Sequence, residues 1–123
     1  MMTSAKVTRW LEQRGVPLDT FEVEYGPELP VLLAVQRNCG WSEARDCEEA
    51  AAGERDVFRA LVRGLEAKGF LSADPAGFYN TTPRGRAAIH WAYGDFSYGV
   101  AVICAEQKLD LHAGLDACGY IGV

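Results

Sequence analysis

The amino-acid sequence predicts a mainly α-helical fold with one small β-hairpin. Several segments repeat apolar residues at the i, i+3, i+4 and i+7 spacing that places them on one face of a helix. Two of these segments are followed by glycines, Gly15 and Gly69, which suit the left-handed residue at which helices often end. Asp74-Pro75-Ala76-Gly77 has the composition of a tight turn between two short extended pieces, and it indicates the hairpin.

Length and composition place the chain among single-domain globular proteins. Its 123 residues, 49% of them apolar and 24% charged, suffice for one domain with a core and exclude the disordered and fibrous classes. No apolar run approaches the roughly 20 residues of a membrane span. The first residues also lack the apolar segment of a signal peptide. We therefore expect a single domain over residues 1–123 that resides in the cytoplasm.

No metal or cofactor is expected. In the cytoplasm the cysteines should stay reduced, and their spacing contains no C-x-x-C. A zinc site built from Cys104, His112 and Cys118 fits no usual ligand spacing, whereas small buried thiols are common in packed cores. The cysteines are Cys39, Cys47, Cys104 and Cys118.

The first third of the chain is expected to contain two helices and a short extended segment. A helix over residues 4–14 has Leu11 on its apolar face, and Val16 is placed to touch it beyond the glycine stop. Residues 20–25, TFEVEY, alternate apolar and acidic side chains, as a short half-buried strand or an extended arm would. A second helix is expected from about Pro30 to Asn38.

Two further helices are expected before the hairpin. An acidic helix begins at the N-cap Ser42 and ends at Gly53. The next helix covers residues 54–69 and ends so that Phe70 folds back onto its last turn. Its predicted buried stripe consists of Val57, Phe58, Leu61, Val62 and Leu65.

After the hairpin, Thr82-Pro83 is typical of a helix start. We expect one aromatic-rich helix over residues 83–108, which tolerates Gly94 and Gly99 at roughly 1 kcal/mol each. A strand remains the alternative for residues 91–104, because Phe96, Tyr98, Val100 and Val102 alternate. The tail from Gly114 is expected to form a last turn and an irregular end.

Two motifs, correctly ordered across the hairpin, resemble the winged helix-turn-helix domain of MarR-type and PadR-type regulators. The first is Leu65-Glu66-Ala67-Lys68-Gly69-Phe70-Leu71, and the second is Thr82-Pro83-Arg84-Gly85-Arg86. The resemblance covers about residues 30–90 and implies extra helices at both ends of the chain. It also implies a recognition helix at residues 54–69, a wing at residues 72–81 and a preceding helix at Ser42–Ala52. A protein of this kind is a DNA-binding transcriptional regulator that acts as a dimer.

Five arginines are the candidate DNA contacts. Residues 54–90 carry six cations against four anions, a local balance of +2, which leaves −7 for the rest of the chain. Charge is therefore segregated in the direction that DNA binding needs, although the wing tip has no lysine or arginine. The alternative is an ordinary solvated face on which Asp56 pairs with Arg59 and Glu66 with Arg63. The candidates are Arg55, Arg59 and Arg63, four residues apart along one helix face, and Arg84 and Arg86 at the next helix start.

The net charge of −5 leads to a second hypothesis from another class. A small acidic winged-helix-like interaction module or inhibitor, of the kind that mobile elements encode, would bind a basic, nucleic-acid-binding protein instead of DNA. We expect a non-enzyme in either case, because the sequence has no phosphate-binding glycine loop and no nucleophile motif. The anionic face would be Glu43, Asp46, Glu48 and Glu49, or Glu22, Glu24 and Glu28.

The aromatic segment is expected to pack beneath the first helix and complete the core. The alternatives are the interface of a homodimer and a patch that binds another protein. Its apolar residues are Trp91, Tyr93, Phe96, Tyr98, Val100, Val102 and Ile103.

Overall fold

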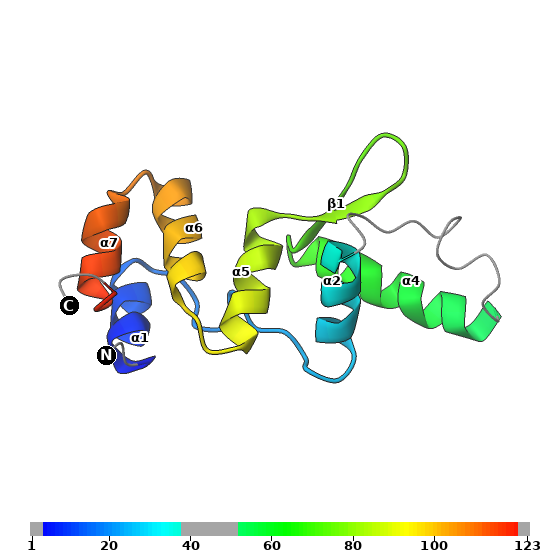
Figure 1. The fold of residues 1–123 in the computed structure, drawn as a ribbon, viewed down its shortest axis with the longest axis horizontal. Coiled ribbons are helices and arrows are strands. Elements are labelled where there is room, and N and C mark those ends of the chain that lie inside the picture. Colours follow the sequence, from blue (N-terminus) through cyan, green and yellow to red (C-terminus); the bar gives the residue numbers. More distant parts are fainter. Residues whose placement is uncertain (1–3, 38–51, 121–123) are drawn as a thin grey trace.

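The helices form a row in which each packs on the next. The computed structural model describes residues 4–37 and 52–120. Contacts join α1 to α7, α7 to α6, α6 to α5, α5 to α2 and α2 to α4, and Figure 1 shows this order from one end to the other. The helices are α1 (Ser4–Gln13), α2 (Glu28–Arg37), α4 (Ala52–Ala67), α5 (Pro83–Ala92), α6 (Ser97–Gln107) and α7 (Leu111–Ala117).

A two-stranded antiparallel hairpin completes the fold, so the prediction of a mainly α-helical chain with one hairpin is confirmed. Strands β1 (Leu71–Ala73) and β2 (Tyr79–Thr81) pair in the register Leu71 to Thr81. The carboxylate of Asp74 accepts hydrogen bonds from the backbone N–H groups of Ala76 and Phe78 across the turn. The hairpin lies against α4 and α2, through β1 and β2 respectively.

The glycine stops act as the sequence predicts. Gly15 and Gly69 both have positive φ, at 71° and 81°. Beyond them the N–H groups of Val16 and Phe70 donate to Leu11 and Leu65, the reach-back bond of a Schellman motif. Both Val16 and Phe70 are buried. The expected helices at residues 4–14, 30–38 and 54–69 are found within two residues of these bounds. The helix expected from Ser42 to Gly53 lies, as far as residue 51, outside the described residues.

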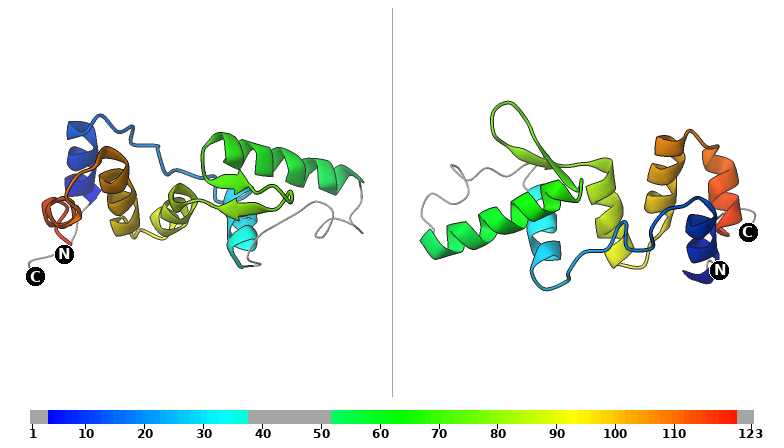
Figure 2. Two further views of the ribbon diagram at one scale, coloured as in Figure 1. Left: turned by 90° about the horizontal axis from the view of Figure 1, so that it is seen from above. Right: turned by 180° about the vertical axis from the view of Figure 1, so that it is seen from behind.

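Between α1 and α2, the chain runs as an arm over residues 14–27. Both views in Figure 2 show it passing along the row from α1 to α2. Residues 22–24 have no regular secondary structure, lie between two turns and pair with no strand among the described residues, so of the two predictions for this segment the strand is wrong. Phe21 and Val23 are buried and thereby fasten the arm to the core, while Glu22 and Glu24 are exposed.

The single helix expected over residues 83–108 is wrong. It is interrupted after Ala92 by Gly94, whose φ is 81°. The N–H groups of Gly94 and Asp95 donate to Trp91 and His90, which makes a further Schellman stop. The Asp95 carboxylate then accepts from the N–H of Ser97 and starts α6. The strand alternative for this segment is also wrong, because residues 97–107 are helical.

Near the C-terminus the structure contains a helix that the sequence did not predict, and the expected last turn at Gly114 belongs to it. Leu111–Ala117 forms α7, which Asp110 caps by accepting a hydrogen bond from the N–H of Ala113 at 3.2 Å. Helix α7 packs on α6, so closely that a Cβ at Gly114 would lie 2.5 Å from the Cys104 sulfur.

A further correction concerns the start of α4. Val57 and Phe58 were expected in its buried stripe but are 60% and 41% exposed. Figure 1 shows the reason: the first half of α4 extends beyond α2 and the hairpin. Val62 and Leu65, in the second half, are buried in the core, and Leu61 packs against it.

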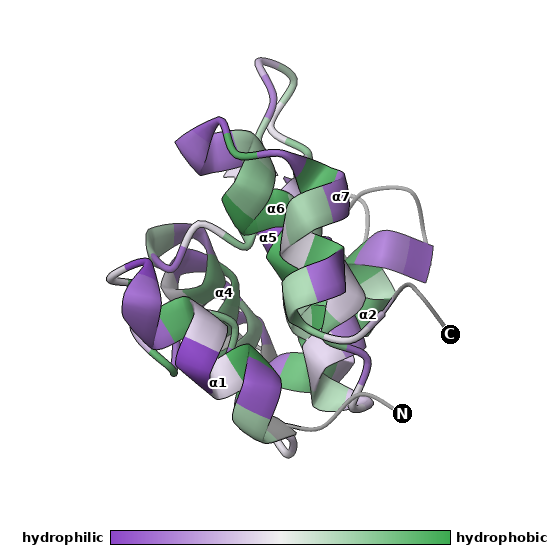
Figure 3. Cartoon of the chain, turned by 90° about the vertical axis from the view of Figure 1, so that its left-hand side faces the viewer, coloured by the Kyte–Doolittle hydropathy of each residue, from purple (hydrophilic) through white to green (hydrophobic). Residues whose placement is uncertain are grey.

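Most of the aromatic segment belongs to the core, as expected. Trp91 contacts Phe21 and Phe96, with ring centroids 5.3 and 4.6 Å apart. Helix α6 is coloured mostly hydrophobic in Figure 3 and buries Val100, Val102 and Ile103. Tyr93 departs from this prediction, since 69% of it is exposed.

Candidate functional site

The candidate site is the exposed first half of α4. Arg55 and Arg59 lie there and are half-buried, and the exposed Arg63 continues the same face in the second half of the helix. Asp56 lies 3.3 Å from Arg59, which is one of the two ion pairs that the solvated-face alternative requires. Such exposed pairs contribute only about 0.2–1 kcal/mol. Glu66 and Arg63 form no ion pair within the described part of the chain.

Arg84 and Arg86 both have partners within the fold. Arg84 forms a bidentate ion pair with Glu106 of α6, at 2.6 and 2.7 Å, and these hydrogen bonds raise the pKa of Arg84 above its ordinary value. Arg86 donates to the Tyr98 hydroxyl at 2.9 Å and to the Thr81 carbonyl at 3.1 Å. Arg86 therefore ties the second strand and α6 to α5, while Arg84 would need to leave Glu106 to meet a phosphate.

Lys68, the cation of the first motif, is also engaged. Its ammonium group lies 2.8 and 2.9 Å from the two carboxylate oxygens of Glu28 at the start of α2. One of these oxygens accepts a further hydrogen bond from the Glu24 N–H at 2.9 Å. Because the Glu28 side chain is only 9% exposed, this pair fastens the end of α4 to α2 and is not open to a ligand.

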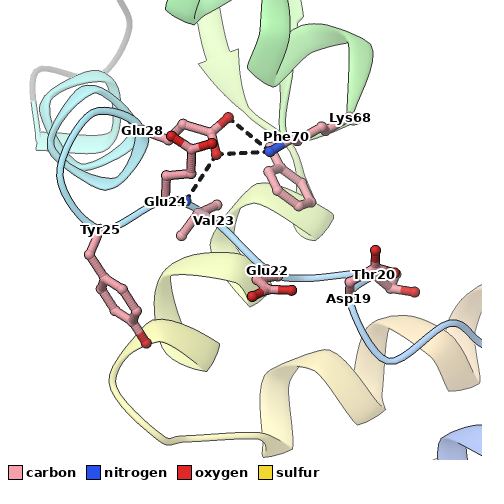
Figure 4. A pocket seen from close by; sticks show the side chains of 9 residues that line it. All are labelled: Asp19, Thr20, Glu22, Val23, Glu24, Tyr25, Glu28, Lys68 and Phe70. Atoms are coloured by element: carbon pink, nitrogen blue, oxygen red, sulfur yellow. Dashed lines mark hydrogen bonds and ion pairs between the residues drawn. The ribbon is translucent and has the colours of Figure 1, made fainter.

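The candidate anionic faces fall in two places. Glu43, Asp46, Glu48 and Glu49 lie outside the described residues. Of the second set, Glu22 and Glu24 are exposed, whereas Glu28 is withdrawn into its pair with Lys68 (Figure 4). Sequence reasoning missed Asp19, which lines the same hollow as these residues. The turn at residues 17–20 within the arm was the available signal, since it places Asp19 ahead of the two glutamates.

A cluster of Ser97, Asp95 and His90 joins α5 to α6. Asp95 accepts from the Ser97 hydroxyl at 2.7 Å and lies 3.2 Å from His90 Nδ1. The hydrogen bond from Ser97 makes the largest contribution, and together with the contact to His90 it holds the pKa of Asp95 below its ordinary value. In a nucleophilic triad the serine would donate to the histidine, but here it donates to the carboxylate. The arrangement therefore serves the turn between two helices.

The two described cysteines, Cys104 and Cys118, are free and buried. Within residues 4–37 and 52–120, no group of three or more His, Cys, Asp or Glu side chains could hold a metal ion. None of the helices in these ranges is long and apolar enough to span a bilayer.

We expect the buried thiols to lower stability at high pH. Burial, and then the neighbouring Cys104, raise the pKa of Cys118 to about 11, whereas an unfolded thiol ionises at about 8.5. The folded state thus keeps a proton that the unfolded chain loses, so this stabilisation is complete below pH of about 8.5 and is lost toward pH 11. Denaturation curves over this range should show wild type losing on the order of 2 kcal/mol more than Cys118→Ala. Identical pH dependence of the two proteins would contradict this expectation.

With the geometry of α4 and its neighbours established, the chain can be compared with known proteins. No protein-family model matches it, and neither does any curated protein or solved structure.

Proposed function

We propose that the chain is a winged-helix DNA-binding regulator that contacts DNA with α4. The observation that carries this proposal is the position of Arg55, Arg59 and Arg63. They follow one another at four-residue intervals along the helix that extends farthest from the rest of the molecule (Figure 1). An exposed helix of this kind fits the major groove, where its cations reach the phosphates on either side.

The arrangement around α4 supports the winged-helix part of the proposal. Helix α2 contacts α4, the hairpin and α5, so it lies at the centre of this half of the molecule. The hairpin follows α4 directly and projects beside it, as a wing would (Figure 1). Thr82 then donates to the Gly69 carbonyl at 2.5 Å and accepts from the Gly85 N–H at 3.0 Å, which joins the end of α4 to the start of α5.

The number of candidate cations argues that two copies act together. Tight DNA binders commonly neutralise about six to ten phosphates. Three arginines on α4, with Arg84 released from Glu106, would supply four contacts from one chain. A dimer doubles this number and reads two half-sites. Since most of the aromatic segment lies in the core, the exposed apolar residues left in the described C-terminal region for a dimer interface are Tyr93, Leu109 and Leu111.

The test is a titration of duplex DNA at several salt concentrations. We expect binding at low salt that weakens steeply as salt rises, and at least a tenfold loss of affinity for the variant Arg59→Ala/Arg63→Ala. The salt dependence of the variant should also fall by roughly 0.9 in log–log slope for each phosphate contact removed. A matched control, Arg9→Ala/Lys108→Asn, removes two exposed cations elsewhere and should bind as wild type does. Undetectable binding of wild type to a genomic DNA pool at low salt would overturn the proposal.

A protein partner on the same helix is the second candidate, and one observation favours it. Val57 and Phe58 are exposed beside the arginines, and large apolar side chains next to arginine are typical of protein interfaces. The variant Val57→Ser/Phe58→Ser separates the two candidates. Under the DNA proposal it keeps its DNA affinity, because serine leaves the phosphate contacts in place. If wild type binds no DNA but co-purifies at a fixed ratio with a protein that this variant does not retain, the second candidate holds.

A further inference from the structure

The arm between α1 and α2 carries a strong and uncompensated negative charge. From Gly15 to Gln36 the sequence contains four acidic residues and no lysine, arginine or histidine. Glu28 is neutralised by Lys68, but Asp19, Glu22 and Glu24 are exposed and have no ion-pair partner among the described residues. These three residues belong to the arm and not to α4, the proposed DNA-contacting helix.

These carboxylates line a hollow of about 600 Å³ beneath the arm. Figure 4 shows Asp19, Glu22 and Glu24 around it, with the Glu28–Lys68 pair at one side. Because Lys68 is already bonded to both oxygens of Glu28, it offers no charge to the other three. The hollow is therefore suited to a cation supplied from outside the chain.

A second hollow of about 290 Å³, lined by aliphatic and aromatic residues together with Glu22, adjoins the first along the same stretch of arm. The two hollows share three lining residues, so they are direct neighbours. Leu18, which is 48% exposed, and Trp91 both line the second hollow. Tyr25 is 66% exposed and is held in place by donating to the Ala92 carbonyl at 3.2 Å. The shared residues are Glu22, Val23 and Tyr25.

We propose that this arm is a docking surface for a basic segment of a protein partner. A lysine or arginine of the segment enters the acidic hollow, and an apolar side chain beside it enters the hollow at Leu18 and Trp91. Charge complementarity selects this occupant: a nucleic acid is repelled by the three carboxylates, and a polyamine has no aliphatic or aromatic side chain for the hollow at Leu18 and Trp91. Exposed aromatic side chains with polar groups at their rim are common in protein interfaces.

The surface is independent of the proposed function, since it uses no residue of α4. A regulator could hold DNA with α4 while a basic partner occupies the arm. The two ideas also fail separately: Glu22→Gln/Glu24→Gln should leave DNA binding unchanged, and Arg59→Ala/Arg63→Ala should leave binding at the arm unchanged.

The experiment selects a random twelve-residue peptide library on the immobilised full chain and then measures individual synthetic peptides by calorimetry. We expect a consensus with two or more basic residues beside a large apolar one. The affinity of these peptides should fall at least tenfold for Glu22→Gln/Glu24→Gln and for Leu18→Ser/Tyr25→Ser. It should change less than twofold for Glu12→Gln/Asp116→Asn, which removes the same charge from exposed sites on α1 and α7.

Three results would overturn the proposal. The first is that the selection enriches no basic consensus. The second is that the enriched peptides bind the arm variants as tightly as they bind wild type. The third is that Leu18→Ser/Tyr25→Ser has no effect while spermine displaces the peptides completely, because binding would then depend on charge alone.

Discussion

Replacing Gly85 with alanine is expected to lower the free energy of unfolding by about 3 kcal/mol, at the upper end of the usual cost of overpacking. A Cβ at this position would overlap the carbonyl oxygen of Phe70 and lie 2.9 Å from its carbonyl carbon. These are backbone atoms, so no rotamer change relieves the overlap. The glycine of the Thr82-Pro83-Arg84-Gly85-Arg86 motif is therefore explained by the close approach of α5 to the end of α4.

Phe70 cannot move aside either, because its backbone is held from both sides. Its N–H donates to Leu65 in the Schellman stop, and its carbonyl accepts from the N–H of Thr82 at 3.1 Å. Moving α5 outward would break the bonds of Thr82 to Gly69 and Gly85 as well. The overlap therefore destabilises the junction between α4, the hairpin and α5.

The matched control is Gly64→Ala on α4, where a new Cβ meets no atom within 4 Å. Because Gly64 is exposed on a helix and alanine favours the helix, this variant should have a free energy of unfolding higher than wild type by roughly 0.5–1 kcal/mol. Urea denaturation followed by circular dichroism measures both variants. Gly85→Ala with wild-type stability would show that α5 does not approach Phe70 as described.

The variant Lys68→Met is expected to cost about 2 kcal/mol, because it leaves the Glu28 carboxylate buried with a single backbone donor. Adding Glu28→Leu should recover most of this loss, since two apolar side chains can then pack where the ion pair lay. A double-mutant cycle therefore gives a coupling free energy above about 1 kcal/mol. The control is the same cycle at the other pair, with Arg84→Met and Glu106→Leu.

The Arg84–Glu106 pair has shorter contacts, but its side chains are 36% and 40% exposed. Water and salt screen such a pair, so its coupling should stay below about 1 kcal/mol. The comparison separates the effect of burial from that of contact distance, because the more buried pair has the longer contacts. If the two cycles give equal coupling, the Glu28–Lys68 pair is not the fastening between α2 and α4 that its burial indicates.

Local signals in the sequence predict much of this fold correctly. Gly15, Gly69 and Thr82 each determine a boundary through their own backbone or side-chain bonds, which depend on few other residues. The turn at Asp74 is predictable for the same reason. Gly94 carries the same kind of signal, but the apolar residues on both sides of it made a continuous helix look equally acceptable.

Tertiary packing accounts for the features that the sequence could not predict. Val57 continues the apolar stripe of Leu61 and Leu65, yet its exposure depends on where α2 and the hairpin end along α4. Similarly, nothing in the local sequence pairs Arg84 with Glu106, because the two lie on different helices 22 residues apart. The availability of a candidate cation is thus a property of the fold, whereas its presence is a property of the sequence.

The pairing of α1 with α7 has a consequence for the order of folding. Helices α5, α6 and α7 contact neighbours that follow within a few residues of chain, but α1 meets α7 across a separation of about a hundred residues, where Trp10 faces Gly114. Closing so long a loop costs conformational entropy before any contact compensates for it. Helix α1 should therefore dock after the other helices have assembled, and its docking brings the arm into place along the row.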